Sequence, residues 1–114
     1  MTIIYHNPRC SKSRQTLEIL QSKEIRPKII LYLDSPPTKA KLIQILSQLG
    51  ISARALLRKN EAAYKDNNLK NTDLTDDQLL DFMVQFPKLI ERPIVIHNDK
   101  AVLGRPPEKV LEII

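Results

Sequence analysis

Short apolar runs bounded by polar residues alternate along the chain with stretches of helical periodicity. Residues 2–5 are mostly β-branched and stop at His6-Asn7-Pro8, which predicts a buried first strand. Apolar residues then recur at helical spacing from residue 11 to about residue 22, and residues 28–33 predict a second buried strand. Because two strands joined through a helix need a crossover connection, we expect these two to pair in parallel.

The middle of the chain has the capping residues and apolar stripes of several helices. Thr38 precedes a stripe of leucine and isoleucine that ends at Gly50, and Ser52 can cap a shorter helix. Thr75-Asp76-Asp77-Gln78 has the form of a capping box with two acids in the first turn. It predicts a helix that reaches about Phe86, after a loop rich in Asn and Asp over residues 67–73.

The C-terminal part predicts a hairpin and a closing helix. Residues 94–97 and 101–103 are two short apolar strands around Asn98-Asp99, and Pro106-Pro107-Glu108 opens a helix that runs to Ile114. The fold class is therefore α/β, with a mixed four-stranded sheet flanked by helices and a helical block between its two halves. We find no repeat or linker, so residues 1–114 are expected to form a single domain.

Composition narrows the class of protein. The 114 residues are 42% apolar and 27% charged, which is globular composition. Two glycines exclude a glycine-rich phosphate loop, and one cysteine excludes a disulfide framework or a multi-cysteine metal site. The longest apolar run, residues 29–33, is too short to span a membrane, and no signal-peptide pattern is visible. We expect a soluble, cytoplasmic monomer without a bound metal or cofactor.

The net charge of +5 is unevenly distributed, since residues 1–60 carry 11 Lys or Arg against 3 Asp or Glu. A basic half of this kind suits nucleic acid, an anionic surface or a small oxyanion. Aromatic residues make up only 4% of the chain, and the basic residues come singly or in pairs. These features favour a solvated basic face or a small-anion site over a nucleic-acid groove.

Cys10 lies between the predicted first strand and the start of the predicted first helix. A thiol at a helix N-terminus faces unpaired N–H groups and the positive end of the helix dipole, which favour the thiolate. Arg14 lies in the same turn, Ser13 can donate a hydrogen bond, and His6 precedes Cys10 by four residues. A buried structural cysteine is the alternative, but the polar flanks favour a reactive thiol.

Thiolate formation alone gives only a few-fold advantage, because nucleophilicity falls as the pKa falls. A further group must position and neutralise the electrophile. Arg58, Arg92 and Arg105 each stand at the end of a predicted element, and a guanidinium matches a tetrahedral oxyanion. Three unrelated surface arginines are the alternative.

Two other thiol chemistries are excluded by position. A C-x5-R phosphatase loop needs Arg where this chain has Thr16, and a C-x-x-C pair needs Cys where it has Ser13. Any disulfide formed by Cys10 during turnover therefore takes its second sulfur from outside the chain, and glutathione is the expected source.

Five segments spread over the chain carry a family resemblance. They are His6-Asn7-Pro8-x-Cys10-x-x-Ser13-Arg14 and residues 30–33, 54–60, 91–95 and 104–108. Together they resemble the glutaredoxin-coupled arsenate reductases of the ArsC family, and most closely its shorter, arsenate-reductase-like branch.

The resemblance implies a thioredoxin-like fold with a helical insertion and a cis bond before Pro93. It implies arsenate as substrate, glutathione as co-substrate, glutaredoxin as partner and a role in arsenic detoxification. Cys10 would attack arsenate, and a Cys10–glutathione mixed disulfide would be resolved by glutaredoxin. His6, Ser13 and Arg14 would shape the surroundings of the thiol. The expected oxyanion ligands are Arg58, Arg92 and Arg105.

Two other functions remain open from the residues. The first is a monothiol, glutathione-dependent reductase that acts on another electrophile. The second is a regulatory binding protein of the same fold that contacts RNA polymerase, although such proteins switch through a C-x-x-C pair, which Ser13 interrupts.

Overall fold

The computed structural model describes all residues, 1–114, and divides them into two compact units. Unit 1 combines Met1–Ser35 with Arg92–Ile114, and unit 2 is the continuous segment Pro36–Glu91. The predicted helical block is therefore an insertion between the two halves of unit 1. None of the helices has the length and hydrophobicity that crossing a membrane requires.

Unit 1 is built on a four-stranded sheet in the order β2-β1-β3-β4. Its strands are β1 (Thr2–His6), β2 (Lys28–Leu31), β3 (Ile94–His97) and β4 (Lys100–Leu103). β1 pairs in parallel with β2, while β1–β3 and β3–β4 are antiparallel, which confirms the predicted mixed sheet. Tyr5, Ile94 and Leu103 lie in one row across three strands. The chain therefore leaves β1, enters β3 and leaves β4 at the same end of the sheet.

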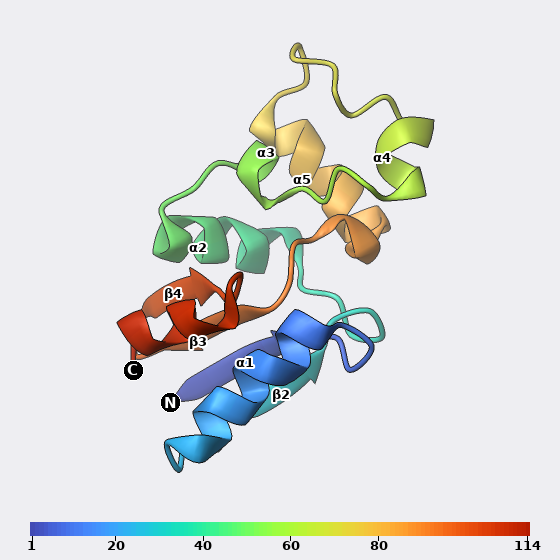
Figure 1. Cartoon of the computed structure of the whole chain (residues 1–114). Helices are drawn as coiled ribbons and strands as arrows, with labels where there is room; N and C mark the ends of the chain where they lie inside the picture. Colours follow the sequence, from blue (N-terminus) through green and yellow to red (C-terminus); the bar gives the residue numbers. More distant parts are fainter. The chain divides into compact units, whose positions relative to one another are not determined.

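One face of this sheet is covered by α1 (Ser11–Ser22) and the 3-10 helix η2 (Pro107–Glu112), as Figure 1 shows. Ile4 and Val95 from the sheet pack with Leu20 of α1 and Val110 of η2, and all four side chains have no exposed surface. Burying each such side chain contributes roughly 1.5–3 kcal/mol. This core holds the N-terminus of α1 in place at the end of β1.

Three predictions for unit 1 need correction. β2 is not a buried strand and ends at Leu31, because it lies at the edge of the sheet, where Ile29 is 46% and Leu31 41% exposed. The closing helix is 3-10 rather than α and stops at Glu112. β4 begins one residue early, at Lys100.

The predicted hairpin around Asn98 and Asp99 is confirmed. Asn98 and Asp99 have φ angles of +48° and +70°, which a two-residue turn between antiparallel strands requires and which Asn and Asp tolerate. The peptide bond between Arg92 and Pro93 is cis, as the resemblance implied, and so is the bond between Arg105 and Pro106.

Unit 2 contains α2 (Lys39–Leu49), α3 (Ala53–Leu56), α4 (Ala62–Asp66), α5 (Asp76–Gln85) and the 3-10 helix η1 (Pro87–Leu89). The predicted caps are present: the hydroxyls of Thr38, Ser52 and Thr75 accept hydrogen bonds from N–H groups of the first turns. Gly50 ends α2 with a φ of +69°. α4 and η1 were not predicted, because their few residues carry no apolar periodicity.

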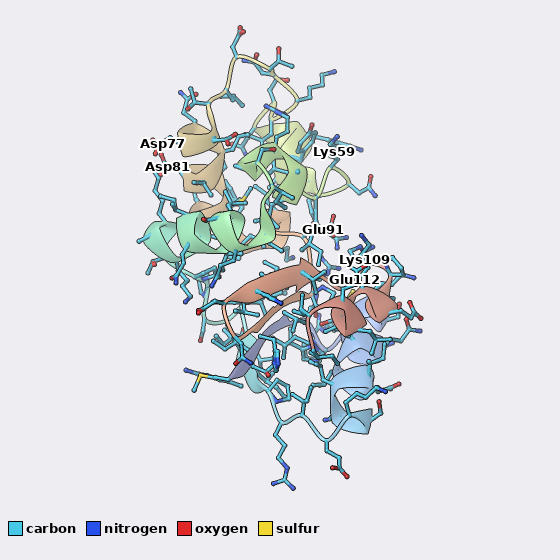
Figure 2. The ribbon with its side chains drawn as sticks, turned by 90° about the vertical axis from the view of Figure 1, so that its left-hand side faces the viewer. Lys59, Asp77, Asp81, Glu91, Lys109 and Glu112 are labelled. Atoms are coloured by element: carbon cyan, nitrogen blue, oxygen red, sulfur yellow. The ribbon has the colours of Figure 1, made fainter.

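An ion-pair cluster joins two helices of this unit. Asp77 and Asp81 lie one turn apart on α5 and project to the same side (Figure 2). The Nζ atom of Lys39 lies 2.8 Å from Asp77 and 2.9 Å from Asp81. All three side chains are substantially exposed, so the cluster contributes little to stability.

Candidate functional site

Cys10 is the N-cap residue of α1, and only 9% of it is exposed. Its own N–H donates to the carbonyl of Asn7 at 3.0 Å, and its carbonyl accepts from the N–H of Arg14 at 3.0 Å. These bonds turn the chain from β1 into the helix. The thiol makes no side-chain capping hydrogen bond. It faces the N–H groups of Lys12 and Ser13 in the first turn, which carry partial positive charge.

The surroundings favour the thiolate form of Cys10. Burial by itself raises the pKa of the thiol, and this effect is outweighed. The N–H of Ser13, the guanidinium of Arg92 and the N–H of Lys12 together hold the pKa of Cys10 below its ordinary value. The predicted thiolate environment is thus present, with Arg92 as the main side chain that produces it.

Two of the three predicted arginines meet at the thiol. Arg92 lies just before β3, and Arg105 lies just after β4. The register of the sheet brings both residues to the end of β1, which Cys10 follows. Nη1 of Arg105 lies 4.0 Å from Sγ of Cys10 and donates to the carbonyl of Arg92 at 3.2 Å. The sulfur therefore faces two guanidinium groups and a helix N-terminus, an arrangement that suits an anionic ligand.

The surroundings of Arg92 stabilise its charged form. Burial lowers the pKa of its guanidinium, but the thiolate of Cys10 and the phenol of Tyr32 outweigh burial and raise it. Tyr32 follows β2 and is 1% exposed. Sequence reasoning gave Tyr32 no role, although it lies in the segment 30–33 that carries part of the resemblance and follows the strand that runs parallel to β1.

His6 and Ser13 form a buried hydrogen-bonded pair beneath the Cys10 loop. The Oγ of Ser13 accepts from the N–H of Asn7 at 3.1 Å and lies 2.5 Å from Nδ1 of His6. The direction of the hydrogen bond between the hydroxyl and Nδ1 is set by the tautomer of the His6 ring. Burial lowers the pKa of His6, and the charge of Arg14 lowers it further, which keeps the ring neutral.

Asn7 is a residue that sequence reasoning missed. Its backbone carbonyl accepts from the N–H of Cys10, and its own N–H donates to the Oγ of Ser13. Its Oδ1 accepts from the N–H of Arg9 at 3.0 Å. The motif His6-Asn7-Pro8 could have indicated it, because Asn before Pro favours a turn.

Arg14 acts on the loop rather than on the sulfur. Its Nη1 donates to the carbonyl of Pro8 at 2.9 Å, and its side chain is exposed. This bond ties the turn before Cys10 to the first turn of α1. The role expected for Arg14 in shaping the surroundings of the thiol stays a prediction.

Arg58 belongs to unit 2, where two carboxylates hold it. Its backbone N–H donates to Leu89 at 2.8 Å, next to the bridge between Leu57 and Ile90. Its Nε lies 3.3 Å from Glu61, and its Nη1 lies 3.5 Å from Glu91. An anion that used Arg58 would compete with these two acids for the guanidinium.

A cavity of about 320 Å³ opens beside the Cys10 loop within unit 1. Its lining combines the loop with the end of the second strand and the chain after it: His6, Asn7, Pro8, Arg9, Leu31, Leu33 and Asp34. It therefore offers an exposed arginine, one carboxylate and two leucines beside the loop that precedes Cys10. No group of three or more His, Cys, Asp or Glu side chains could hold a metal ion.

The model of the ArsC family matches residues 5–113. The chain belongs to the ArsC family. An Escherichia coli (strain K12) protein named "Uncharacterized protein YfgD" is 52% identical over 112 residues, which cover 97% of this chain and 94% of that protein. An Escherichia coli protein named arsenate reductase is 50% identical over 111 residues, covering 97% of this chain and 79% of that protein.

Solved structures agree with this ArsC assignment. The structure described as arsenate reductase from Vibrio cholerae matches with a TM-score of 0.97 and 49% identity, covering 99% of this chain and 97% of that one. The thioredoxin-like fold with a helical insertion, expected from the resemblance, is thereby confirmed.

Proposed function

We propose that this ArsC protein reduces arsenate to arsenite, with the thiolate of Cys10 as the nucleophile. The observation that carries the proposal is the buried Sγ with a lowered pKa, faced by the guanidinium groups of Arg92 and Arg105. Names of close relatives point to the same anion. Arsenate is a tetrahedral oxyanion, and two guanidinium forks can bind its oxygens while the sulfur approaches arsenic.

The reaction divides into two balanced steps. In the first, Sγ of Cys10 forms a bond to arsenic, and one As–O bond breaks, the oxygen leaving as water after protonation. In the second, a glutathione thiolate forms a disulfide with Sγ. The S–As bond breaks, its electron pair stays on arsenic, and arsenite leaves. Two thiol sulfurs have lost two electrons and arsenic has gained them.

A second thiol must come from outside, because Cys10 is the only cysteine. We place glutathione in the cavity beside the Cys10 loop, where the exposed Arg9 can pair with one of its carboxylates and Leu31 and Leu33 offer apolar surface. Glutaredoxin then reduces the Cys10–glutathione disulfide by thiol–disulfide exchange.

The remaining roles follow from the site's contacts and the family resemblance. Ser13 and His6 hold the turn whose N–H groups face the thiol, and Arg14 ties the same loop from outside. We assign Arg58 to oxyanion binding from the family resemblance alone. It would have to exchange its carboxylate partners for arsenate oxygens.

The test is NADPH oxidation in a mixture of glutathione reductase, glutathione, glutaredoxin and arsenate. We expect arsenate-dependent turnover that disappears in Cys10→Ser and falls at least ~100-fold in Arg92→Ala, as for loss of one oxyanion ligand. Arg26→Ala removes an exposed arginine at the far end of the sheet and is the matched control, with full turnover expected.

Two results would contradict the proposal. One is the absence of turnover above the Cys10→Ser blank. The other is turnover with a small glutathione mixed disulfide but none with arsenate, which would assign the protein to the monothiol reductases instead.

A further inference from the structure

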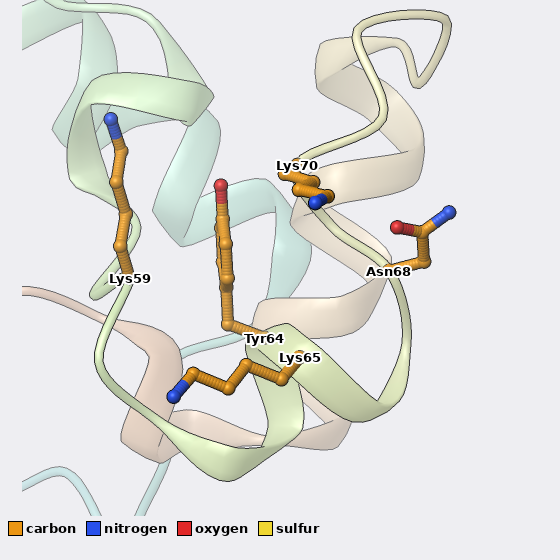
Figure 3. A pocket seen from close by; sticks show the side chains of 5 residues that line it. All are labelled: Lys59, Tyr64, Lys65, Asn68 and Lys70. Atoms are coloured by element: carbon orange, nitrogen blue, oxygen red, sulfur yellow. The ribbon is translucent and has the colours of Figure 1, made fainter.

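A second cavity, of about 450 Å³, lies wholly within unit 2 and shares no lining residue with the Cys10 site. It is lined by Lys59, Tyr64, Lys65, Asn68 and Lys70 (Figure 3). Lys59 precedes α4, Tyr64 and Lys65 belong to it, and Asn68 and Lys70 follow it. In Figure 3 the side chains of Lys59 and Tyr64 extend in the same direction, whereas Asn68 points away from Tyr64.

The three lysines concentrate positive charge at this cavity. All three are exposed, and the ion pairs of unit 2 involve Lys39 and Arg58 rather than any of them. The nearby Glu61 is already paired with Arg58. Three ammonium groups around one hollow repel one another, and a bound anion with several charges relieves that repulsion.

The backbone that carries these side chains is held in place. Leu69 has no exposed surface, and its N–H donates to the carbonyl of Tyr64 at 2.9 Å. The guanidinium of Arg54 donates to the carbonyls of Leu69 and Asn71, each at 2.9 Å. The turn after α4 is therefore fixed before any ligand arrives, which lowers the entropic cost of binding.

Tyr64 gives the cavity a wall of a different kind. Its ring is half-buried and lines the hollow together with the lysine stems. The cavity's volume lies within the range, about 300–1,000 Å³, of sites for drug-sized organic ligands. Lysine binds phosphate as a point charge, and an aromatic ring stacks on a planar base.

We propose that this cavity binds a small molecule that joins a polyphosphate group to a planar ring, the chemistry of a nucleoside triphosphate. The lysines hold the phosphates, and Tyr64 contacts the ring. The inference goes beyond the proposed reductase function and does not depend on it, because no group of the Cys10 site takes part.

The test is an NMR titration of ¹⁵N-labelled protein with ATP and, separately, with inorganic tripolyphosphate, at about 150 mM NaCl, where the Debye length is about 8 Å. We expect both ligands to shift the amide signals of residues 59–70. Lys65→Ala/Lys70→Ala should weaken both affinities about tenfold, since it removes two of the three positive charges that line the cavity. Lys41→Ala/Lys88→Ala removes two exposed or half-exposed lysines of the same unit and should change affinity less than twofold.

Tyr64→Leu distinguishes binding of the ring from binding of the phosphates. It should weaken the binding of ATP about fivefold or more, because the base loses its stacking partner, and leave the affinity for tripolyphosphate within about twofold. An equal loss in the control pair would overturn the proposal, since it would show attraction to the net charge alone. Shifts centred on the Cys10 loop, or the same affinity for ATP in Tyr64→Leu, would also overturn it.

Discussion

The thiol of Cys10 is buried, so its lowered pKa depends on the groups that face it. Among side chains, Arg92 has the largest influence. Arg92→Gln keeps a polar side chain but removes the positive charge, and we expect it to raise the pKa of Cys10. The measurement is the rate of alkylation by iodoacetamide as a function of pH, whose midpoint should move to higher pH.

Arg26→Gln is the control for this change, because Arg26 is exposed and precedes β2 at the opposite end of the sheet. Its midpoint should equal that of the unchanged protein. If Arg92→Gln also left the midpoint in place, the assignment of Arg92 to thiolate stabilisation would be wrong.

The lowered pKa of Cys10 also links folding stability to pH. Between that pKa and the ordinary thiol value of 9.0, the unfolded chain holds a proton that the folded chain has lost. The free energy of unfolding therefore gains a contribution that is complete above the unfolded pKa and is lost as pH falls through the folded pKa. Urea unfolding should show the stability difference between Cys10 and Cys10→Ser growing with pH in this window. Parallel pH profiles would contradict the link.

The position of the thiol could be predicted from local sequence, because a strand, a turn and a helix within fourteen residues place Cys10 at a helix N-terminus. The pairing of His6 with Ser13 could not. The pairing depends on the path of the backbone at Asn7, whose N–H bonds to Ser13 in the first turn of α1. The spacing of apolar residues does not predict that path. Arg14 was expected in the right segment, although its bond to Pro8 was not visible from spacing.

At the scale of elements, helix termini were the most predictable features, because capping is a local hydrogen-bond rule. Thr75 caps α5 and forms a full capping box with Gln78. Thr75→Ala should lower the free energy of unfolding by about 1 kcal/mol. Urea unfolding measures this, with the exposed Thr72→Ala as the control, for which no more than about 0.5 kcal/mol is expected. Equal losses in both variants would contradict the capping role.

Gly104 fixes the distance between α1 and the end of β4. A Cβ atom there would overlap Oγ1 of Thr16 and lie 2.8 Å from Cγ of Pro93. Gly104→Ala should therefore destabilise the protein by about 1–3 kcal/mol, as overpacking does. Thr16→Ala removes the nearer contact, so a double-mutant cycle by urea unfolding should show that the two losses are less than additive. Strict additivity would contradict direct crowding.

Elements whose character depends on the rest of the sheet were less predictable. Residues 28–33 have the apolar composition of a central strand, yet β2 has a single neighbour and leaves Ile29 and Leu31 exposed. Edge or centre is decided by strand order, which local composition does not encode. α4 was missed for a related reason, since its five residues depend on packing and on the turn at Leu69 rather than on an amphipathic pattern.

At the scale of the whole molecule, the site in unit 1 is assembled from segments about eighty to ninety-five residues apart. Sheet topology makes this possible, since β1, β3 and β4 bring the chain ends at Cys10, Arg92 and Arg105 to one end of the sheet. The order of elements predicted the two halves but not the pairing of β1 with β3. The meeting of the two arginines at the thiol therefore follows from the register of the sheet and not from the order of elements. The single-domain expectation stays a prediction beside the division into two units.

The net charge of +5 and the guanidinium groups at Cys10 should together make the thiolate selective for anionic electrophiles. Iodoacetate and iodoacetamide differ chiefly in charge, so the ratio of their alkylation rates reports the local potential. At low ionic strength we expect this ratio to exceed that of a small free thiol several-fold. It should fall as KCl is added, because the Debye length shrinks from about 30 Å at 0.01 M to about 3 Å at 1 M.

Arg105→Ala separates the local from the global part of this effect. It lowers the net charge by one unit, as the control Arg26→Ala does, but only Arg105 lies 4.0 Å from Sγ. The iodoacetate preference should therefore fall in Arg105→Ala and persist in Arg26→Ala, and the residual salt dependence should be similar in both. A ratio that is insensitive to salt and to Arg105 would mean that the sulfur is screened from both guanidinium groups. Anion attraction would then play no part in the reactivity of Cys10.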